Sequence, residues 1–323
     1  MTHPPASAPR RHRRAAGQLL LGLVPVLVVG LVVLGALALR LGDVQAPLAA
    51  ASSTAPATVT RSGTAPDGRG LTVTFDDAAG TERTGTIELD QALDVPVGTQ
   101  FPVQFDPDDP GSGTVYTDGD AAHTAVGDVV FGLVAVVSVL LVVGALTLGR
   151  LAARPRLRGR PATTVTGTHV VVGRGLLVRS WLELDTAAGL RWLPVHWAPE
   201  VDRMTPGTRL QVHGDPARDQ QVLPVVGGTE VWPSGRLRSR EPRGEVRQAP
   251  VVPDATELGL ARQVRADGVL PFLSPALGLL WAYVDGSGPR GFVVATALAA
   301  AVLFWVPQWL GSDPRATSRD QLY

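Results

Sequence analysis

The stretch QLLLGLVPVLVVGLVVLGALAL, from Gln18 to Leu39, carries no charged residue and consists almost entirely of Leu, Val, Gly and Ala. A helix of about 20 apolar residues covers the core of a bilayer, which is about 30 Å thick. A cleaved signal peptide is the alternative, because arginines precede the stretch and Ala49 to Ala51 offer small residues for cleavage. The stretch exceeds the roughly 7–15 apolar residues of a signal core, so a retained transmembrane helix over residues 18–40 is favoured.

Three further stretches have the same character, over residues 126–149, 268–284 and 291–311. The third of the four stretches is the shortest and contains Pro271 and Pro275, so a buried helix of a soluble domain is its alternative. A glycine-containing turn between the last two predicts a helical hairpin. We therefore expect an α-helical membrane protein with four transmembrane helices.

Arginine is distributed unevenly around these stretches. Residues 10–14 contain four arginines, and residues 150–160 contain five. Residues 41–125 have a net charge of −10, whereas residues 150–268 have a net charge of +6. Because basic loops stay in the cytoplasm, we expect a multi-pass protein of the plasma membrane. The basic tail 1–17 and the tail 312–323 would be cytoplasmic, and residues 41–125 would lie outside.

Two polar segments between the stretches show the alternation of half-buried strands. Leu71, Val73 and Phe75 alternate with threonines, and Phe101, Val103 and Phe105 alternate with Pro102 and Gln104. We predict two small all-β domains, barrel-like or sandwich-like, over residues 41–125 and 150–232. Residues 47–57, rich in Ala, Ser and Pro, are predicted to be a linker. Residues 233–267, rich in Arg, Glu and Pro, are predicted to be a flexible linker, with a short helix around residues 255–265 as an alternative.

Several short runs of the first β segment recur in the second. The run 77–80 (DAAG) corresponds to 186–189 (TAAG), and 98–107 (GTQFPVQFDP) corresponds to 207–216 (GTRLQVHGDP), both at an offset of 109 residues. A third pair, 58–60 and 164–166, shares the sequence TVT. This pattern predicts an internal repeat of helix, β domain and helix; independent use of similar turns is the alternative.

The first β segment also resembles a bacterial family of uncharacterised membrane proteins. The resemblance rests on ATVT at 57–60, VGT at 97–99 and VQFDPDDP at 103–110. In that family, a domain of unknown function, a small β domain ending in V-x-V-x-Y-D-P-x-x-P lies between two transmembrane helices. Phe105 replaces the usual Tyr and Phe101 the first Val. The resemblance covers residues 18–150 and implies an architecture, with no activity attached.

The composition excludes several kinds of chemistry. Cysteine is absent, which rules out disulfides, thiol nucleophiles and cysteine metal sites. All 29 basic residues are arginine, which indicates the coding bias of a GC-rich bacterium. Apart from Asp128, which marks the outer edge of the second stretch, no Asp, Glu, Lys, Arg or His lies inside the four apolar stretches, and this disfavours ion-coupled transport.

Candidate site residues each have a structural interpretation that is favoured. Asp106, Asp108 and Asp109 could bind Ca²⁺, but their prolines favour a turn. The run Gly173-Arg174-Gly175 is read as a hairpin turn, and Ser138 as a helix-packing hydroxyl. His196, beside Trp197 and Trp192, is read as a packed or surface residue of a β domain and not as a catalytic base. We therefore predict no catalytic, cofactor-binding or metal-binding residue.

These observations favour a non-enzymatic binding or scaffold component that links the envelope and cytoplasmic faces. An accessory subunit of a membrane enzyme or of a transport complex is the alternative. The expected partners are the lipid bilayer, anionic headgroups near Arg150 to Arg160 and an unidentified protein. A homo-oligomer is compatible with the sequence, and nucleic acid is not an expected partner.

Overall fold

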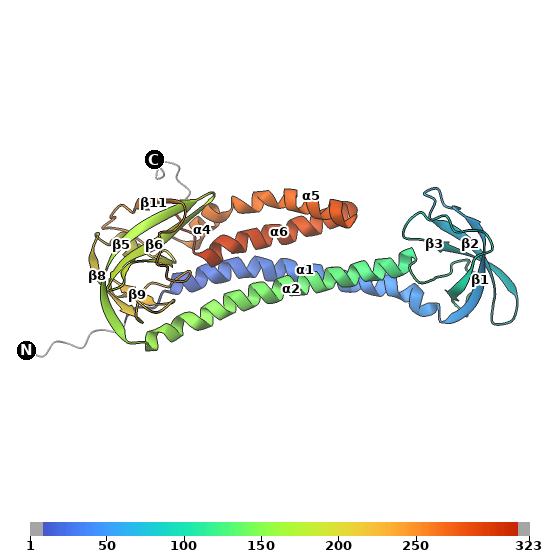
Figure 1. The fold of residues 1–323 in the computed structure, drawn as a ribbon, viewed down its shortest axis with the longest axis horizontal. Helices are drawn as coiled ribbons and strands as arrows, with labels where there is room; N and C mark the ends of the chain where they lie inside the picture. Colours follow the sequence, from blue (N-terminus) through green and yellow to red (C-terminus); the bar gives the residue numbers. More distant parts are fainter. Residues whose placement is uncertain (1–8, 316–323) are drawn as a thin grey trace, which may run out of the picture. The chain divides into compact units, whose positions relative to one another are not determined.

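The computed structural model describes residues 9–315, which form two compact units. One unit contains residues 31–139, and the other combines residues 9–30 with residues 140–315. Four helical stretches are long and apolar enough to cross a membrane (Figure 1). They are Arg13–Ala50, Ala121–Gly159, Leu260–Asp285 and Gly288–Leu310. The parts of the tails 1–17 and 312–323 that fall at 1–8 and 316–323 lie outside the described residues.

The helices extend beyond the apolar stretches that predicted them. Helix α1 covers Arg13–Ala50 and helix α2 covers Ala121–Arg156. Pro47 therefore lies inside α1, and β1 begins at Ser53, so the linker predicted for residues 47–57 is wrong. An apolar run marks only the centre of a helix, and the alanines that follow it are strong helix formers.

The unit of residues 31–139 contains a four-stranded antiparallel sheet of order β3-β2-β1-β4. Its strands are β1 (Ser53–Ser62), β2 (Gly70–Asp76), β3 (Glu82–Glu88) and β4 (Gln100–Phe105). The alternation predicted for β2 and β4 is confirmed, because Leu71, Val73, Phe75, Val103 and Phe105 are all buried in one core. The rings of Phe75 and Phe105 lie 5.0 Å apart at its centre.

A short segment after β4 joins the two outer strands of this sheet. The Val115 N–H donates to the Thr86 carbonyl of β3, and Tyr116 exchanges two backbone hydrogen bonds with Gln104 of β4. Backbone hydrogen bonds therefore run around the whole domain. This arrangement leaves fewer unpaired edge groups than an open sheet of four strands would.

The other unit contains a seven-stranded sheet of order β10-β9-β8-β5-β6-β7, with β11 paired to β5. Its strands are β5 (Ala162–Arg174), β6 (Leu177–Thr186), β7 (Gly189–Val195), β8 (Thr208–His213), β9 (Leu223–Val226), β10 (Thr229–Glu230) and β11 (Glu245–Gln248). The short helices η1 (Leu157–Gly159) and α3 (Pro199–Asp202) accompany it. Leu182, Leu193, Val195 and Val212 are fully buried in its core.

Residues 233–267, predicted to be a flexible linker, contain ordered structure. Strand β11 pairs with β5 over four residues, and helix α4 covers Leu260–Asp267. Gln263 and Asp267 of α4 are buried. The short helix expected around residues 255–265 is present as α4. Strand β11 was missed because its order comes from pairing with a distant strand.

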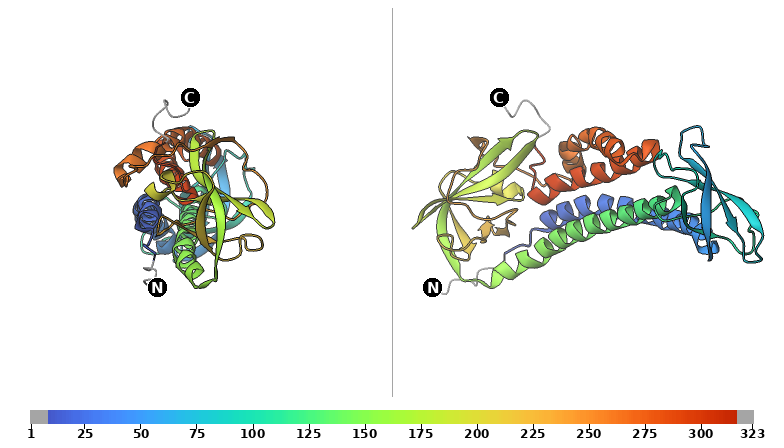
Figure 2. Two further views of the ribbon diagram at one scale, coloured as in Figure 1. Left: turned by 90° about the vertical axis from the view of Figure 1, so that its left-hand side faces the viewer. Right: turned by 45° about the vertical axis from the view of Figure 1, so that its right-hand side comes forward.

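Four helical segments pack together in this second unit. The early part of α1, the late part of α2 and α6 (Gly288–Leu310) meet at a cluster that includes Val26, Val143 and Trp305. The Trp305 indole N–H donates to the Thr147 hydroxyl at 2.9 Å. The predicted hairpin is confirmed: η2 (Leu270–Leu273) and α5 (Ser274–Asp285) are followed by Gly286 in a left-handed conformation, and α5 and α6 lie side by side (Figure 2).

The first four strands of the two sheets have the same order. The order β3-β2-β1-β4 corresponds to β7-β6-β5-β8, and all neighbours are antiparallel. The match of the two TVT runs is shifted, however. The strand registers place Thr58 opposite Gln100 and Thr166 opposite Arg209, so Thr58 corresponds to Thr166, the last residue of the second run.

Candidate functional site

The residues that follow α6 attach to the seven-stranded sheet. Gly311 ends the helix with a φ of 74°, which an L side chain rarely adopts. The Asp313 N–H then donates to the Val178 carbonyl at 2.9 Å, and Ser312 forms an isolated bridge with Arg179. A segment that sequence analysis placed in a tail therefore contributes side chains to the interior of the β domain.

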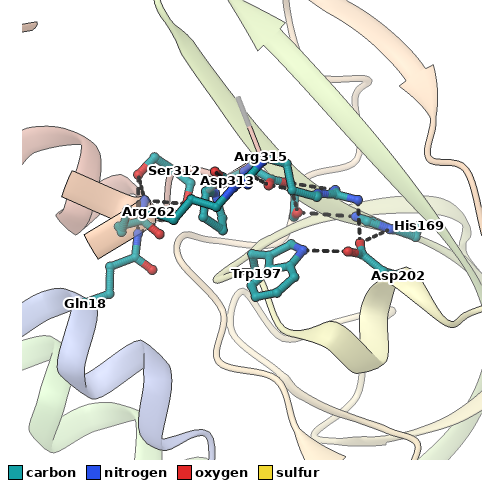
Figure 3. Close-up of polar contacts among 11 residues, drawn as sticks. Gln18, His169, Trp197, Asp202, Arg262, Ser312, Asp313 and Arg315 are labelled. Carbon is teal, nitrogen blue, oxygen red and sulfur yellow. Dashed lines mark hydrogen bonds and ion pairs between the residues drawn. The ribbon is translucent and has the colours of Figure 1, made fainter. Parts of the chain in front are cut away.

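Arg315 joins two buried carboxylates in this interior (Figure 3). Its guanidinium lies 2.8 Å from Asp202 Oδ1 and 2.7 Å from Asp313 Oδ2. The Trp197 indole N–H donates to Asp202 Oδ2 at 2.9 Å. Burial raises the pKa of Asp202 to about 6 despite the nearby Arg315. Burial would also raise the pKa of Asp313, but its hydrogen bonds with Arg315 bring the net shift below the ordinary value.

In space, Ser180, His169 and Asp202 follow one another as the serine, histidine and aspartate of a hydrolase triad do. The Ser180 Oγ lies 3.3 Å from His169 Nε2, and His169 Nδ1 lies 3.6 Å from Asp202 Oδ1. The hydroxyl donates its hydrogen to Asp313 Oδ2 at 2.8 Å, however, and Ser180 is fully buried. A nucleophile must be reachable and must give its proton to the base. The arrangement therefore has the connectivity of a structural network.

The protonation of His169 agrees with this interpretation. Burial, and then the positive charge of Arg315, lower the pKa of His169 to about 4. The ring is consequently neutral near pH 7, with Ser180 as the partner of one nitrogen. A general base that works near neutral pH needs a pKa close to that pH, and His169 does not meet this condition.

A second polar cluster connects three helices next to the first. The Asp267 carboxylate of α4 accepts hydrogen bonds from Gln263, Gln308 and the Ser312 hydroxyl at 2.7, 2.6 and 2.8 Å. Gln18 of α1 donates to the Ser312 carbonyl at 3.2 Å. Buried polar groups of this kind fix the relative positions of the elements that carry them.

The residues before α1 are also bonded to the β domain. Arg10 and Glu230 are linked through a backbone hydrogen bond of 2.9 Å. His12 Nδ1 accepts the Trp232 N–H at 3.0 Å, while Nε2 lies 3.2 Å from the Trp197 carbonyl. These partners specify a neutral ring, and burial, followed by the charge of Arg14, lowers its pKa to about 3.

A pocket of about 560 Å³ opens beside the Arg315 network. It is bounded by β11 and by the segment that leads to α4, and Arg262, Arg315, Asp202 and Asp313 line it. Residues of both charge signs and Trp197 therefore border this space. The pocket is therefore suited to a partner that offers polar and charged groups together with some apolar surface.

The residues singled out in the sequence do not converge on one site. Asp106 accepts the backbone N–H of Asp108 at 2.9 Å, which is the predicted turn. Gly175 has a positive φ between β5 and β6, so the predicted hairpin is confirmed. Ser138 bonds to the carbonyl four residues earlier in its own helix. His196 is fully buried beside Gln18, so of the two positions expected for it, packed or at the surface, it occupies the packed one.

Three of the five arginines at 150–160 contact protein groups in this structure. Arg158 pairs with Glu230 at 2.6 Å, and Arg160 lies 3.1 Å from Asp219. The guanidinium of Arg150 lies over the Trp309 ring, 4.0 Å from its centroid. Within residues 9–315 no group of three or more histidine, aspartate or glutamate side chains is placed to hold a metal ion.

Sequence reasoning missed His169, Ser180, Asp202, Asp313 and Arg315. Their partners are far apart in the chain, and no short motif connects them. The one local signal is the charged pair of the Asp313-Pro314-Arg315 run, which begins two residues after Gly311.

The chain was compared with protein-family models, curated proteins and solved structures, and none of them matches it.

Proposed function

We propose that this chain is a multi-pass protein of a bacterial plasma membrane whose two β domains act as non-enzymatic binding modules. The main support is that both ends of the helical run meet the same domain. Arg10, before α1, is bonded to β10, and Asp313, after α6, is bonded to β6. Chain ends on one side of a bilayer require an even number of crossings, as four spans provide.

Retention of α1 is part of this proposal. Cleavage near Ala51 would remove a helix whose side chains are bonded to distant segments. The Arg14 guanidinium donates to Gln263 at 2.9 Å, and Leu23 and Val26 are buried against α2 and α6. Cleavage would break these contacts with the rest of the fold, so we expect the mature protein to keep α1.

The orientation follows from charge. The arginine clusters at 10–14 and 150–160 favour a cytoplasmic seven-stranded domain and an external four-stranded domain. Alkaline phosphatase fused after Gly113 is expected to be active, since the enzyme matures only outside the cytoplasm, whereas a fusion after Gly227 is expected to be inactive. Equal activity of the two fusions would contradict this topology.

The proposal of a binding role, and not a catalytic one, is supported by the contacts of the buried polar groups and by the adjacent pocket. The hydroxyl of Ser180 and the carboxylates of Asp202 and Asp313 are engaged with each other and with Arg315. The adjacent pocket of about 560 Å³ remains open to a partner. A photo-reactive residue in place of Thr256, which lines the pocket, is expected to capture a partner in cells. The same residue in place of Leu176, exposed at the β5–β6 turn, is the control; identical adducts at both positions would refute the pocket as the binding surface.

We also propose that the two β domains are copies of one unit. Equal strand order supports this, and so do three turns at an offset of 109 residues. In these turns Asp77 and Thr186 each accept the N–H two residues ahead, as do Asp106 and Asp215. The third pair, Thr99 and Thr208, each donates its hydroxyl to the carbonyl three residues earlier. The resemblance of residues 18–150 to a membrane family with one such domain between two helices fits the same proposal.

A further inference from the structure

A second pocket, of about 750 Å³, is strongly basic. It is lined by β5, β6 and the segment before β11, and it includes one acidic residue, Glu241. Five arginines line it: Arg174, Arg179, Arg238, Arg240 and Arg243. Within the described part of the chain, none of the five forms a salt bridge, that is, has a carboxylate oxygen within 4.0 Å.

This cluster differs from other arginines of the same domain. Arg158, Arg160 and Arg315 each lie within 3.1 Å of a carboxylate oxygen of the same unit. A concentration of cations without counter-charges raises the free energy of a folded domain. A binding partner that brings negative charge would remove this cost.

Two of the arginines are held close to one indole ring. The guanidinium carbons of Arg179 and Arg238 lie 5.2 and 5.4 Å from the centroid of Trp181. Burial, and then the charge of Arg238, lower the pKa of Arg179 to about 10. Two like charges are thus kept close together in a partly desolvated place, where an anion between them would be strongly favoured.

Arg179 also has unused hydrogen-bonding capacity. Its Nη2 donates to the Ser234 hydroxyl at 3.0 Å, and this contact orients the side chain. Its Nε is buried and has no acceptor among the described residues. A guanidinium donates two parallel hydrogen bonds to phosphate or carboxylate oxygens, so an oxyanion is the chemical class that completes this group.

We propose that this pocket binds a phosphate group. Several converging guanidinium groups fit the multiple oxygens and the double charge of phosphate better than a single carboxylate. Leu310, the last residue of α6, lines the pocket. If α6 crosses the bilayer as proposed above, its end lies near the headgroups, so the phosphate of an anionic lipid and free phosphate are both within reach.

Binding by the purified full chain, stripped of lipid in a neutral detergent, tests the proposal. The first probe is inorganic phosphate, and its binding is measured by calorimetry. The second is phosphatidylglycerol in nanodiscs, compared with nanodiscs of phosphatidylcholine alone. We expect Arg238→Gln, and the double variant Arg240→Gln/Arg243→Gln, to weaken binding by at least about tenfold, since a hydrogen bond to a charged group is lost. These side chains are exposed, so the variants are expected to fold.

The matched control is Arg218→Gln, which removes one charge from a side chain that is 89% exposed and does not line the pocket. Binding of inorganic phosphate supports a soluble ligand, and binding only to phosphatidylglycerol nanodiscs supports a lipid headgroup. Absence of binding to both probes overturns the proposal. Equal weakening by Arg218→Gln and the pocket variants also overturns it, because attraction would then be general. The reporter fusions test topology independently, so failure of one proposal is distinguishable from failure of the other.

Discussion

The guanidinium of Arg315 lies 2.8 Å from the carboxylate of Asp202, although more than a hundred residues separate the two along the chain. Asp202 ends α3 of the β domain, and Arg315 follows α6. Arg315 also pairs with Asp313, whose backbone is bonded to β6. One side chain therefore connects the last apolar helix to the interior of the seven-stranded domain.

Replacement of Arg315 by alanine is expected to destabilise this unit. The change leaves Asp202 and Asp313, which are 3% and 1% exposed, without their shared cation. Breaking a buried ion pair by removing one partner costs about 3–5 kcal/mol. Thermal unfolding in detergent measures the effect, and Arg218→Ala, at an exposed position, should change stability by less than about 0.5 kcal/mol. Similar melting temperatures for the two variants would show that the network contributes little.

Acid is expected to destabilise the protein through its buried histidines. The pKa of His12 is lowered from 6.5 to about 3, so the unfolded chain binds a proton that the folded chain excludes between these values. Stability is therefore complete above pH 6.5 and is lost as the pH falls, by about 2 kcal/mol at pH 5 for this residue. His169, with its pKa lowered to about 4, acts in the same direction. Asp202, with a pKa raised to about 6, offsets part of the loss.

The variant His12→Gln isolates the contribution of one ring. It is expected to be less stable than the native chain at pH 7, because the Trp232 N–H loses its acceptor. Between pH 7 and pH 5, the variant should lose about 2 kcal/mol less stability than the native chain loses. Denaturant unfolding at the two pH values provides the measurement. A native slope for His12→Gln would contradict the assignment.

The elements of the fold follow from local sequence, whereas the polar networks do not. The apolar stretch after Gln18 and the alternation at Leu71, Val73 and Phe75 carry periodic signals that identify a helix and a strand. Asp313 and Arg315 carry no such signal, because their burial depends on a β domain whose strand β6 lies more than a hundred residues earlier. Strand β11 escaped prediction for the same reason, since its order comes from pairing with β5. Contacts of this kind require the tertiary fold before they can be recognised.

Close packing of α1 on α6 depends on Gly22. A Cβ at this position would lie 2.8 Å from Cβ and 2.9 Å from Cγ of Gln308. Small residues allow helices to approach closely in membrane proteins, and overpacking costs about 1–3 kcal/mol. Gly22→Val is therefore expected to lower the melting temperature, whereas Gly35→Val, in the same helix with no atom within 4 Å, should not. Equal effects of the two changes would mean that helix propensity, and not packing, decides the outcome.

If the β domains are copies, the same substitution at equivalent turn residues should destabilise the two domains by similar amounts. Gly98 and Gly207 occupy the same place before their threonines and have φ values of 89° and 70°. Alanine in this left-handed region costs about 1–2 kcal/mol, so Gly98→Ala and Gly207→Ala should each destabilise their own domain by that amount. Hydrogen exchange of peptides from each domain measures the two losses separately. Gly111→Ala, whose added Cβ would meet nothing nearer than 3.8 Å and whose φ is not positive, is the control. A large loss of stability from one substitution and none from the other would show that the two turns are not structurally equivalent. The proposal of duplication would then rest on strand order alone.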